Sequence, residues 1–125
     1  MTQEDRKLLL KDLSARLPYK VKIQCINSDN ETVIEELFTI GIEEDSFDCN
    51  LIEYVSVKPY LFPLSSMNEE QDKEFALLQT SAGKEGFLYA WNCANMMKWL
   101  IENHFDYNGL IEKGLAIDAT NKNIY

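Results

Sequence analysis

The stretch YKVKIQC (residues 19–25) alternates apolar and polar side chains with a period of two. Successive side chains of a strand point to opposite faces of a sheet, so this pattern predicts a half-buried strand. The turn-forming run NSDN (residues 27–30) follows, and residues 32–42 are again rich in strand-forming side chains. We therefore expect a β-hairpin. Its register stays open, because Glu36 shares the parity of Ile34 and Phe38.

A third strand is expected at residues 47–51 (FDCNL), where the alternation returns after a polar turn at residues 43–46. Together the three segments predict an antiparallel meander of three to four strands. The next segment, SVKPYLFPLSSM (residues 56–67), contains Pro59 and Pro63, which lack a backbone donor. We expect it to run extended along an edge or across the surface, with Tyr60 and Phe62 exposed.

Three helices complete the expected fold. The first begins at a capping box of Thr2 with Asp5 and ends at Pro18; the second spans residues 67–79 after a box of Ser66 with Glu69. A small, glycine-containing stretch at residues 80–86 leads to a longer apolar helix that reaches His104. The fold class is thus α+β, with two further helices packed on one sheet face. The expected core is Leu9, Leu13, Leu17, Val21, Ile23, Phe38, Ile40, Phe47, Leu51, Phe75, Leu78, Trp91, Leu100 and Leu110.

Composition indicates one globular domain over residues 1–125, with a polar, frayed tail from about residue 118. The chain is 46% hydrophobic and has no apolar run long enough to span a membrane. The charged N-terminal segment does not look like a signal peptide, so we expect a cytoplasmic protein. The oligomeric state cannot be derived from these features.

Charge argues against direct binding to nucleic acids. The net charge is −9, and residues 29–56 carry nine acids and no base. Proteins that bind nucleic acids broadly need clustered lysine and arginine to neutralise phosphates.

No pattern identifies an enzyme, a metal site or a cofactor. Glu43, Glu44, Asp45 and Asp48 lack the glycine and the bidentate glutamate of a calcium loop, so we interpret them as a solvated turn. A nucleophile with a base would need His104 beside a cysteine. Cys25 and Cys49 fall on apolar strand parity and His104 at a helix end, where an imidazolium would satisfy carbonyls, so structural roles are expected.

Three segments taken together resemble a known family: LLLKDLSARLPYKVK, VKPYLFPLSSM and HFDYNGLIEKGLA. It is a family of small uncharacterised proteins found in prophages of gut bacteria and in other mobile elements. The resemblance covers about half of the residues, in matching order. Family members often carry a basic residue where this chain has Asn108. The resemblance implies a genomic setting and no activity.

Three functions remain open from the sequence. The first is a small non-enzymatic protein-interaction module, whose candidate partner surface is Tyr60, Phe62, Glu43, Glu44, Asp45 and Asp48. The second is an acidic inhibitor that mimics DNA charge and competes for a basic groove. The third is a small hydrolase that uses His104 and a cysteine.

Overall fold

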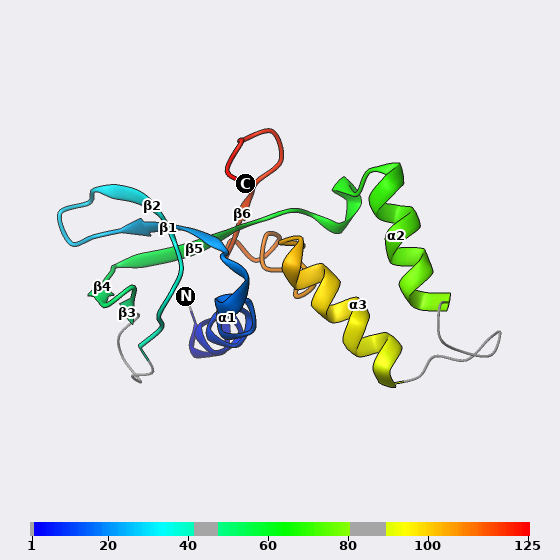
Figure 1. Cartoon of the computed structure of the whole chain (residues 1–125). Coiled ribbons are helices and arrows are strands. Elements are labelled where there is room, and N and C mark those ends of the chain that lie inside the picture. Colours follow the sequence, from blue (N-terminus) through cyan, green and yellow to red (C-terminus); the bar gives the residue numbers. More distant parts are fainter. Residues whose placement is uncertain (1, 42–47, 81–89) are drawn as a thin grey trace.

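The structure is a computed structural model that describes residues 2–41, 48–80 and 90–125 (Figure 1). It combines helices with a mixed sheet, which confirms the α+β class. In chain order the elements are α1 (Gln3–Arg16), η1 (Leu17–Tyr19), β1 (Lys22–Ile26), β2 (Thr32–Glu36), β3 (Asp48–Cys49), β4 (Ile52–Glu53), β5 (Ser56–Leu61), η2 (Leu64–Ser66), α2 (Glu69–Thr80), α3 (Ala90–Glu102) and β6 (Ile117–Asp118).

The expected hairpin is present as β1 and β2, which pair antiparallel. Its turn is organised by Asn27, whose side-chain oxygen accepts from the backbone amides of Asp29 (3.0 Å) and Glu31 (2.9 Å). Val21, Ile23 and Cys25 are all fully buried, as the alternation predicts.

The main sheet differs from the expected meander. Its order is β2-β1-β5-β6, with β5 antiparallel to β1 and parallel to β6. The prediction that the proline-containing segment avoids a central position is wrong, because β5 lies between two strands. Pro59 is tolerated there because β6 is short and its pairing with β5 begins only at Tyr60, one residue later.

The strand expected at residues 47–51 is also different. Only Asp48–Cys49 form β3, which pairs with β4 in a separate two-stranded sheet. The second strand of the expected hairpin stops at Glu36, well before residue 42, and Ile40 then makes a single bridge to Cys49.

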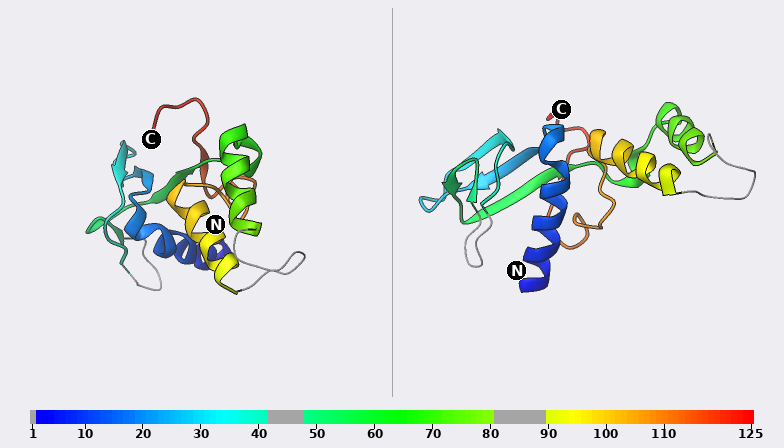
Figure 2. Two further views of the ribbon diagram at one scale, coloured as in Figure 1. Left: turned by 45° about the vertical axis from the view of Figure 1, so that its right-hand side comes forward. Right: turned by 60° about the horizontal axis from the view of Figure 1, so that its bottom comes forward.

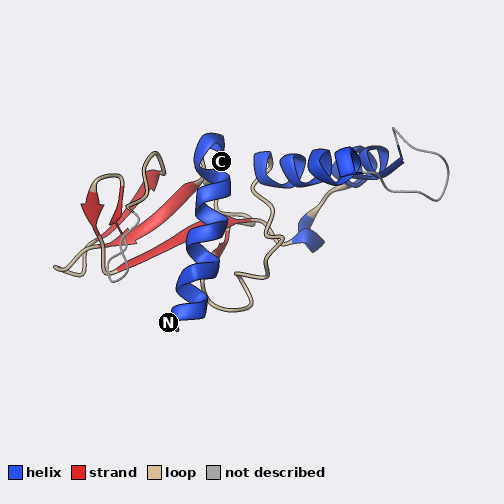
Figure 3. Cartoon of the chain, turned by 90° about the horizontal axis from the view of Figure 1, so that it is seen from below, coloured by secondary structure: helices blue, strands red, loops and turns tan. Residues whose placement is uncertain are grey.

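Helix α1 packs across one face of the sheet, as Figure 3 shows from below. Leu9 and Leu13 of α1 form a core with strand residues, and Leu17 and Ile40 pack at its margin. Three expected core residues are instead exposed, namely Phe38 (58%), Leu51 (82%) and Trp91 (52%). Phe47 lies outside the described residues. The buried cluster is Leu9, Leu13, Val21, Ile23, Cys25, Leu37, Cys49, Tyr54, Val57, Leu61, Leu110, Leu115 and Ala116.

Helices α2 and α3 pack against each other and extend away from the sheet instead of covering a face of it (Figures 1 and 2). Both are joined to the body by an aromatic series in which successive ring centroids lie 5.5–6.2 Å apart. The series runs through Phe75, Trp99, Phe105, Phe62 and Tyr125.

The cap of α2 lies two residues later than predicted. Asn68 Oδ1 accepts from the Gln71 amide (2.8 Å), and Gln71 Oε1 accepts from the Asn68 amide (3.1 Å), so these residues replace Ser66 and Glu69. The capping box of Thr2 with Asp5 is confirmed. Most of the expected linker, residues 81–86, lies outside the described residues. No helix in the described part of the chain is both long and apolar enough to cross a membrane.

The segment expected to fray is bonded to the sheet. The Ala119 amide donates to the Leu61 carbonyl (2.8 Å). The Tyr125 hydroxyl accepts from the Lys22 amide (2.9 Å) and donates to the Tyr60 carbonyl (2.7 Å). This hydroxyl therefore bridges β1 and β5 at the end of their ladder, and the prediction of a frayed tail is wrong.

A buried ion pair joins α1 to the segment that follows α3. Arg16 Nε donates to Asp12 Oδ1 (2.6 Å), and neither side chain is accessible to solvent. Arg16 Nη2 also donates to the Phe105 carbonyl (2.6 Å), and Asn108 Nδ2 donates to Asp12 Oδ2 (2.8 Å). The Tyr107 ring lies 5.0 Å from the guanidinium carbon. The two charges are thus held by each other and by residues 105–108, which are distant in the sequence.

We expect Arg16→Met to lower the free energy of unfolding by about 3–5 kcal/mol, because it leaves the Asp12 carboxylate buried without its cation. Urea unfolding measures this. The double variant Asp12→Leu/Arg16→Met should be closer to the wild type, since it buries no charge. The exposed pair of Lys98 with Glu102 gives a control, and Lys98→Met should cost less than about 1 kcal/mol. Equal effects of Arg16→Met and Lys98→Met would contradict this role.

Candidate functional site

The two aromatic residues of the predicted partner surface, Tyr60 and Phe62, do not form an exposed site in the structure. Tyr60 is only 4% exposed, so its predicted exposure is wrong: in β5 it lies inside the sheet, and the Tyr125 hydroxyl bonds its carbonyl. Phe62 is half-buried between the rings of Phe105 and Tyr125. Both side chains therefore pack against other residues of the protein and do not form an exposed aromatic surface.

The acidic part of the predicted surface is described only at Asp48, because Glu43, Glu44 and Asp45 lie outside the described residues. Asp48 is half-buried in β3 beside Gly41. A Cβ atom at position 41 would lie 2.6 Å from the Asp48 Cβ, so glycine permits this approach. Within the described ranges, no group of three or more His, Cys, Asp or Glu side chains could hold a metal ion.

The cysteines do not have the environment of a nucleophile. Burial raises the pKa of the Cys25 thiol to about 11 and that of Cys49 to about 12, with neighbouring negative charge adding to both shifts. A catalytic thiol needs the opposite shift. Cys93 is exposed on α3.

His104 ends helix α3 through its backbone. Its φ of 61° is left-handed, its amide donates to the Ile101 carbonyl (3.1 Å), and the Phe105 amide donates to the Leu100 carbonyl (2.9 Å). This pair of bonds is the Schellman arrangement. The imidazole stacks on the Tyr125 ring at 3.8 Å. Burial, aided by the Arg16 charge, lowers the pKa of His104 to about 4, so the expected imidazolium is instead neutral near pH 7.

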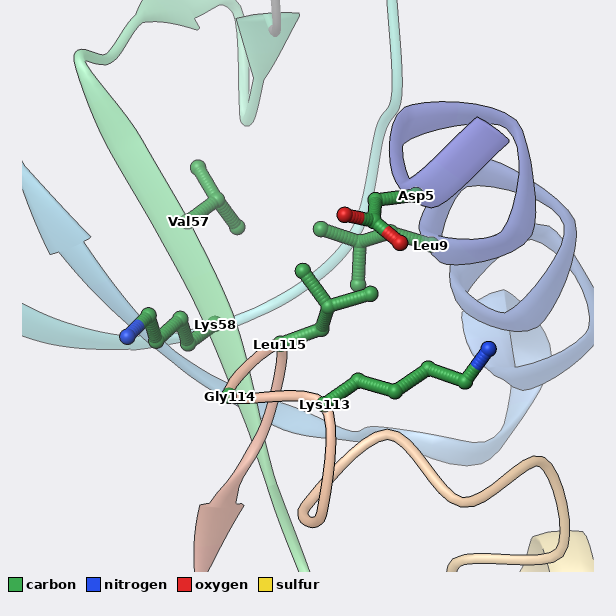
Figure 4. A pocket seen from close by; sticks show the side chains of 7 residues that line it. All are labelled: Asp5, Leu9, Val57, Lys58, Lys113, Gly114 and Leu115. Carbon is green, nitrogen blue, oxygen red and sulfur yellow. The ribbon is translucent and has the colours of Figure 1, made fainter. Parts of the chain in front are cut away.

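A cavity of about 290 Å³ opens between α1, β5 and the loop before β6 (Figure 4). Leu9, Val57 and Leu115 of its lining belong to the buried core. In Figure 4 the ammonium groups of Lys58 and Lys113 point to opposite sides of the cavity. Its charged groups therefore do not converge on one ligand position.

The strongest functional feature is the tight turn between β3 and β4. Asn50 and Leu51 both have positive φ, at 54° and 66°, as the two central residues of a type I′ hairpin turn require. Asn50 suits this conformation, but a leucine there is strained. The Leu51 side chain is 82% exposed, so it gains almost nothing from burial.

The Asn50 side chain fastens this turn to the end of β2. Its Oδ1 accepts from the Phe38 amide (2.8 Å), and its Nδ2 donates to the Glu36 carbonyl (2.9 Å) and to Glu35 Oε2 (3.1 Å). Nearby, the Val55 amide donates to the Ile26 carbonyl (2.8 Å). The turn and strand β2 therefore lie at the same end of the molecule, away from α2 and α3 (Figure 1).

Exposed apolar side chains gather on these connected segments, and acids accompany them. We call this set the apolar–acidic surface. Its apolar members are 48–82% exposed, and its acids are exposed as well. The set is Ile34, Phe38, Leu51, Ile52 and Val55, with Asp29, Glu31, Glu36 and Glu53.

Sequence reasoning missed this surface because alternation over residues 47–51 placed Leu51 on the buried face. One signal was present: Asn50 lies between two short β-rich runs, which is typical of a two-residue hairpin turn. The turn was not recognised because its second position holds leucine, where glycine is the usual residue.

Comparison with protein-family models, with curated proteins and with solved structures finds no match to this chain.

The thiols should react at very different rates. At pH 8 we expect one thiol per chain to be labelled quickly by an aromatic disulfide reagent, because only Cys93 is exposed. Cys25 and Cys49 should react only after unfolding. In Cys93→Ser the fast phase should disappear; a fast phase that persists would contradict the buried positions of the other two.

The low pKa of His104 should appear in the pH dependence of stability. The unfolded chain binds a proton near pH 6.5 and the folded chain only near pH 4, so protonation favours unfolding. His104 therefore reduces stability as pH falls from about 6.5 to about 4. We expect His104→Phe to lose less Tm than the wild type between pH 7 and pH 4.5. Parallel Tm curves for the two proteins would rule this out.

Proposed function

We propose that this protein is a non-enzymatic interaction module that docks a partner protein through the apolar–acidic surface. The observation that carries the proposal is Leu51, which combines a strained backbone with a side chain 82% exposed. Strain of this kind persists where the surrounding structure imposes it, and it clusters at functional positions. Folding alone gives no reason for leucine at this position.

The chemistry of the surface defines the partner. Exposed apolar patches rimmed by polar groups are characteristic of protein-binding sites. The segment that carries these acids, residues 29–56, contains no lysine or arginine, and β1 supplies one base beside it, Lys22, in register with Glu36. A complementary partner therefore presents an apolar group framed by lysine or arginine side chains.

A DNA mimic is the second candidate, and the acidic composition of residues 29–56 favours it. Two features of the described residues weigh against it. Glu35 is half-buried and bonded by Asn50 and by the Tyr54 hydroxyl (3.4 Å). Exposed apolar side chains also lie among the exposed acids, whereas a mimic of phosphates needs a continuous anionic surface.

The hydrolase is the weakest candidate, since the thiol pKa values of Cys25 and Cys49 are raised and His104 stacks on Tyr125. A setting in a prophage or another mobile element, and in the cytoplasm, is part of the proposal and is supported by the sequence alone.

The variant Leu51→Gly separates binding from folding. Glycine relieves the left-handed strain of about 1–2 kcal/mol but adds freedom to the unfolded chain. We therefore expect stability that is unchanged or higher by up to about 1 kcal/mol in urea unfolding. The same variant should capture a partner less well.

Capture from a bacterial lysate, quantified by mass spectrometry, tests the binding. Proteins retained by the wild type should fall at least about fivefold with Leu51→Gly, in line with loss of one interface anchor. Leu64→Ala removes an exposed leucine elsewhere (47%) and should capture normally. Equal capture by Leu51→Gly and wild type would reject the proposal. Loss of capture only on charge reversal at Glu43, Glu44, Asp45 and Asp48 would favour the DNA mimic.

A further inference from the structure

The backbone of β2 has one edge bonded to β1 and, among the described residues, one open edge, and two hydrogen bonds show which residues face each way. The Leu37 amide donates to the Val21 carbonyl (2.9 Å), and the Asn27 amide donates to the Glu31 carbonyl (3.1 Å). In an antiparallel pair, residues bonded to the partner strand alternate with residues that face away. The odd-numbered residues of β2 therefore bond β1, and the amides and carbonyls of Thr32 and Ile34 point outward.

In the described part of the chain, no strand pairs with this outer edge, because β2 is the end strand of its sheet. Asn50 Nδ2 already occupies the outward carbonyl of Glu36 (2.9 Å), so the open stretch ends there. Thr32 and Ile34 are both exposed, and Ile34 is 53% accessible. No group of the described residues bonds the outward amides and carbonyls of Thr32 and Ile34, so an added strand finds two donors and two acceptors there.

The usual protection of an edge strand is incomplete here. Proteins block open edges with lysine, proline, bulges or inward-pointing charges. Strand β2 carries neither proline nor lysine, and of its two charged residues only the half-buried Glu35 shares the face of buried Leu37, while Glu36 is exposed on the other face. Acidic side chains repel an acidic strand but attract a basic one, so this edge is selective by charge.

A second copy of this chain fits the edge poorly. In the two-fold register that pairs Thr32 with Ile34, Glu31 lies directly opposite Glu35, and like charges placed opposite each other are destabilising. The register that places Ile34 against itself pairs Thr32 with Glu36, whose carbonyl is already bonded to Asn50. Charge thus favours a different chain with basic side chains.

We propose that the partner adds an extended, lysine- or arginine-bearing segment to the outer edge of β2, bonded to the backbone of Thr32 and Ile34. This inference rests on the proposed function and specifies the partner's conformation and charge. Strand addition takes affinity from main-chain bonds and selectivity from the side chains beside them. Ile34 and Glu36 lie on both the edge and the apolar–acidic surface, so one partner segment can use both.

The test uses the whole protein and a short peptide of alternating lysine and valine as the probe. Hydrogen exchange by NMR should show the Thr32 and Ile34 amides slowed at least about tenfold by saturating peptide, as strand pairing protects amides. The same peptide with every amide methylated, and a glutamate–valine peptide, should give no protection. Binding of the lysine peptide without protection of these amides, or no binding, overturns the inference. Protection that grows with protein concentration alone would assign the edge to a second copy and also overturns it.

A substitution pair checks the backbone role. Ile34→Pro removes an outward amide and leaves the bonds of the odd-numbered residues to β1 in place. Ile34→Ala removes the side chain but keeps the amide. We expect Ile34→Pro to abolish peptide binding and Ile34→Ala to weaken it only slightly. Equal loss in both variants would show that only the side chain matters. The proposed function is judged separately by Leu51→Gly, which leaves this edge intact.

Discussion

The Arg16 guanidinium, buried with no access to solvent, holds the rest of the structure in place. It bonds Asp12 within α1 and the carbonyl of Phe105, 89 residues further along the chain. A charge can be buried at this depth only if it is paired and hydrogen-bonded, so α1 and the segment after α3 must meet in one arrangement. Asn108 of the same segment donates to the second carboxylate oxygen of Asp12, so this segment is bonded to both charges.

The position of Phe105 in turn determines where the aromatic series lies, and this series joins α2 and α3 to the rest of the protein. Its ring packs against Trp99 of α3 and against Phe62 at the end of β5. Trp99 also stacks on Phe75 of α2. The two helices are thus attached at one end of the sheet, and the opposite end, with β2 and the β3–β4 turn, is left uncovered. The placement of the helices and the proposed partner surface therefore have a common cause.

The sequence predicted two local features correctly, because one short segment carried the signal for each. Alternation at residues 19–25 identified β1, and the capping box of Thr2 with Asp5 identified the start of α1. Predictions failed where distant residues decided the outcome. Pro59 argued against a central strand, because proline has no amide to donate. Strand β5 is nevertheless central, since its pairing with β6 begins only at Tyr60, after the proline. Tyr60 was expected to be exposed for the same reason. Its burial depends on neighbours distant in the sequence, which no local pattern reveals.

The candidate site was less predictable than the fold. Phe38 and Leu51 were placed in the core because apolar residues usually lie there, and an exposed apolar residue is recognised only once its neighbours are known. The acidic character of residues 29–56 and the lack of bases there were evident from composition, since charge is a property of the residues themselves.

By itself, then, the sequence determined the α+β class, the hairpin, the first helix and the sign of the surface charge. These follow from side-chain period, caps and ionisation, which act within a few residues. Only the tertiary structure decided the order of the sheet, the burial of Arg16, the strained exposure of Leu51 and the open edge of β2. Each of these depends on contacts between residues far apart in the chain. Such contacts contribute more free energy than the propensities of single residues, so they can override those propensities.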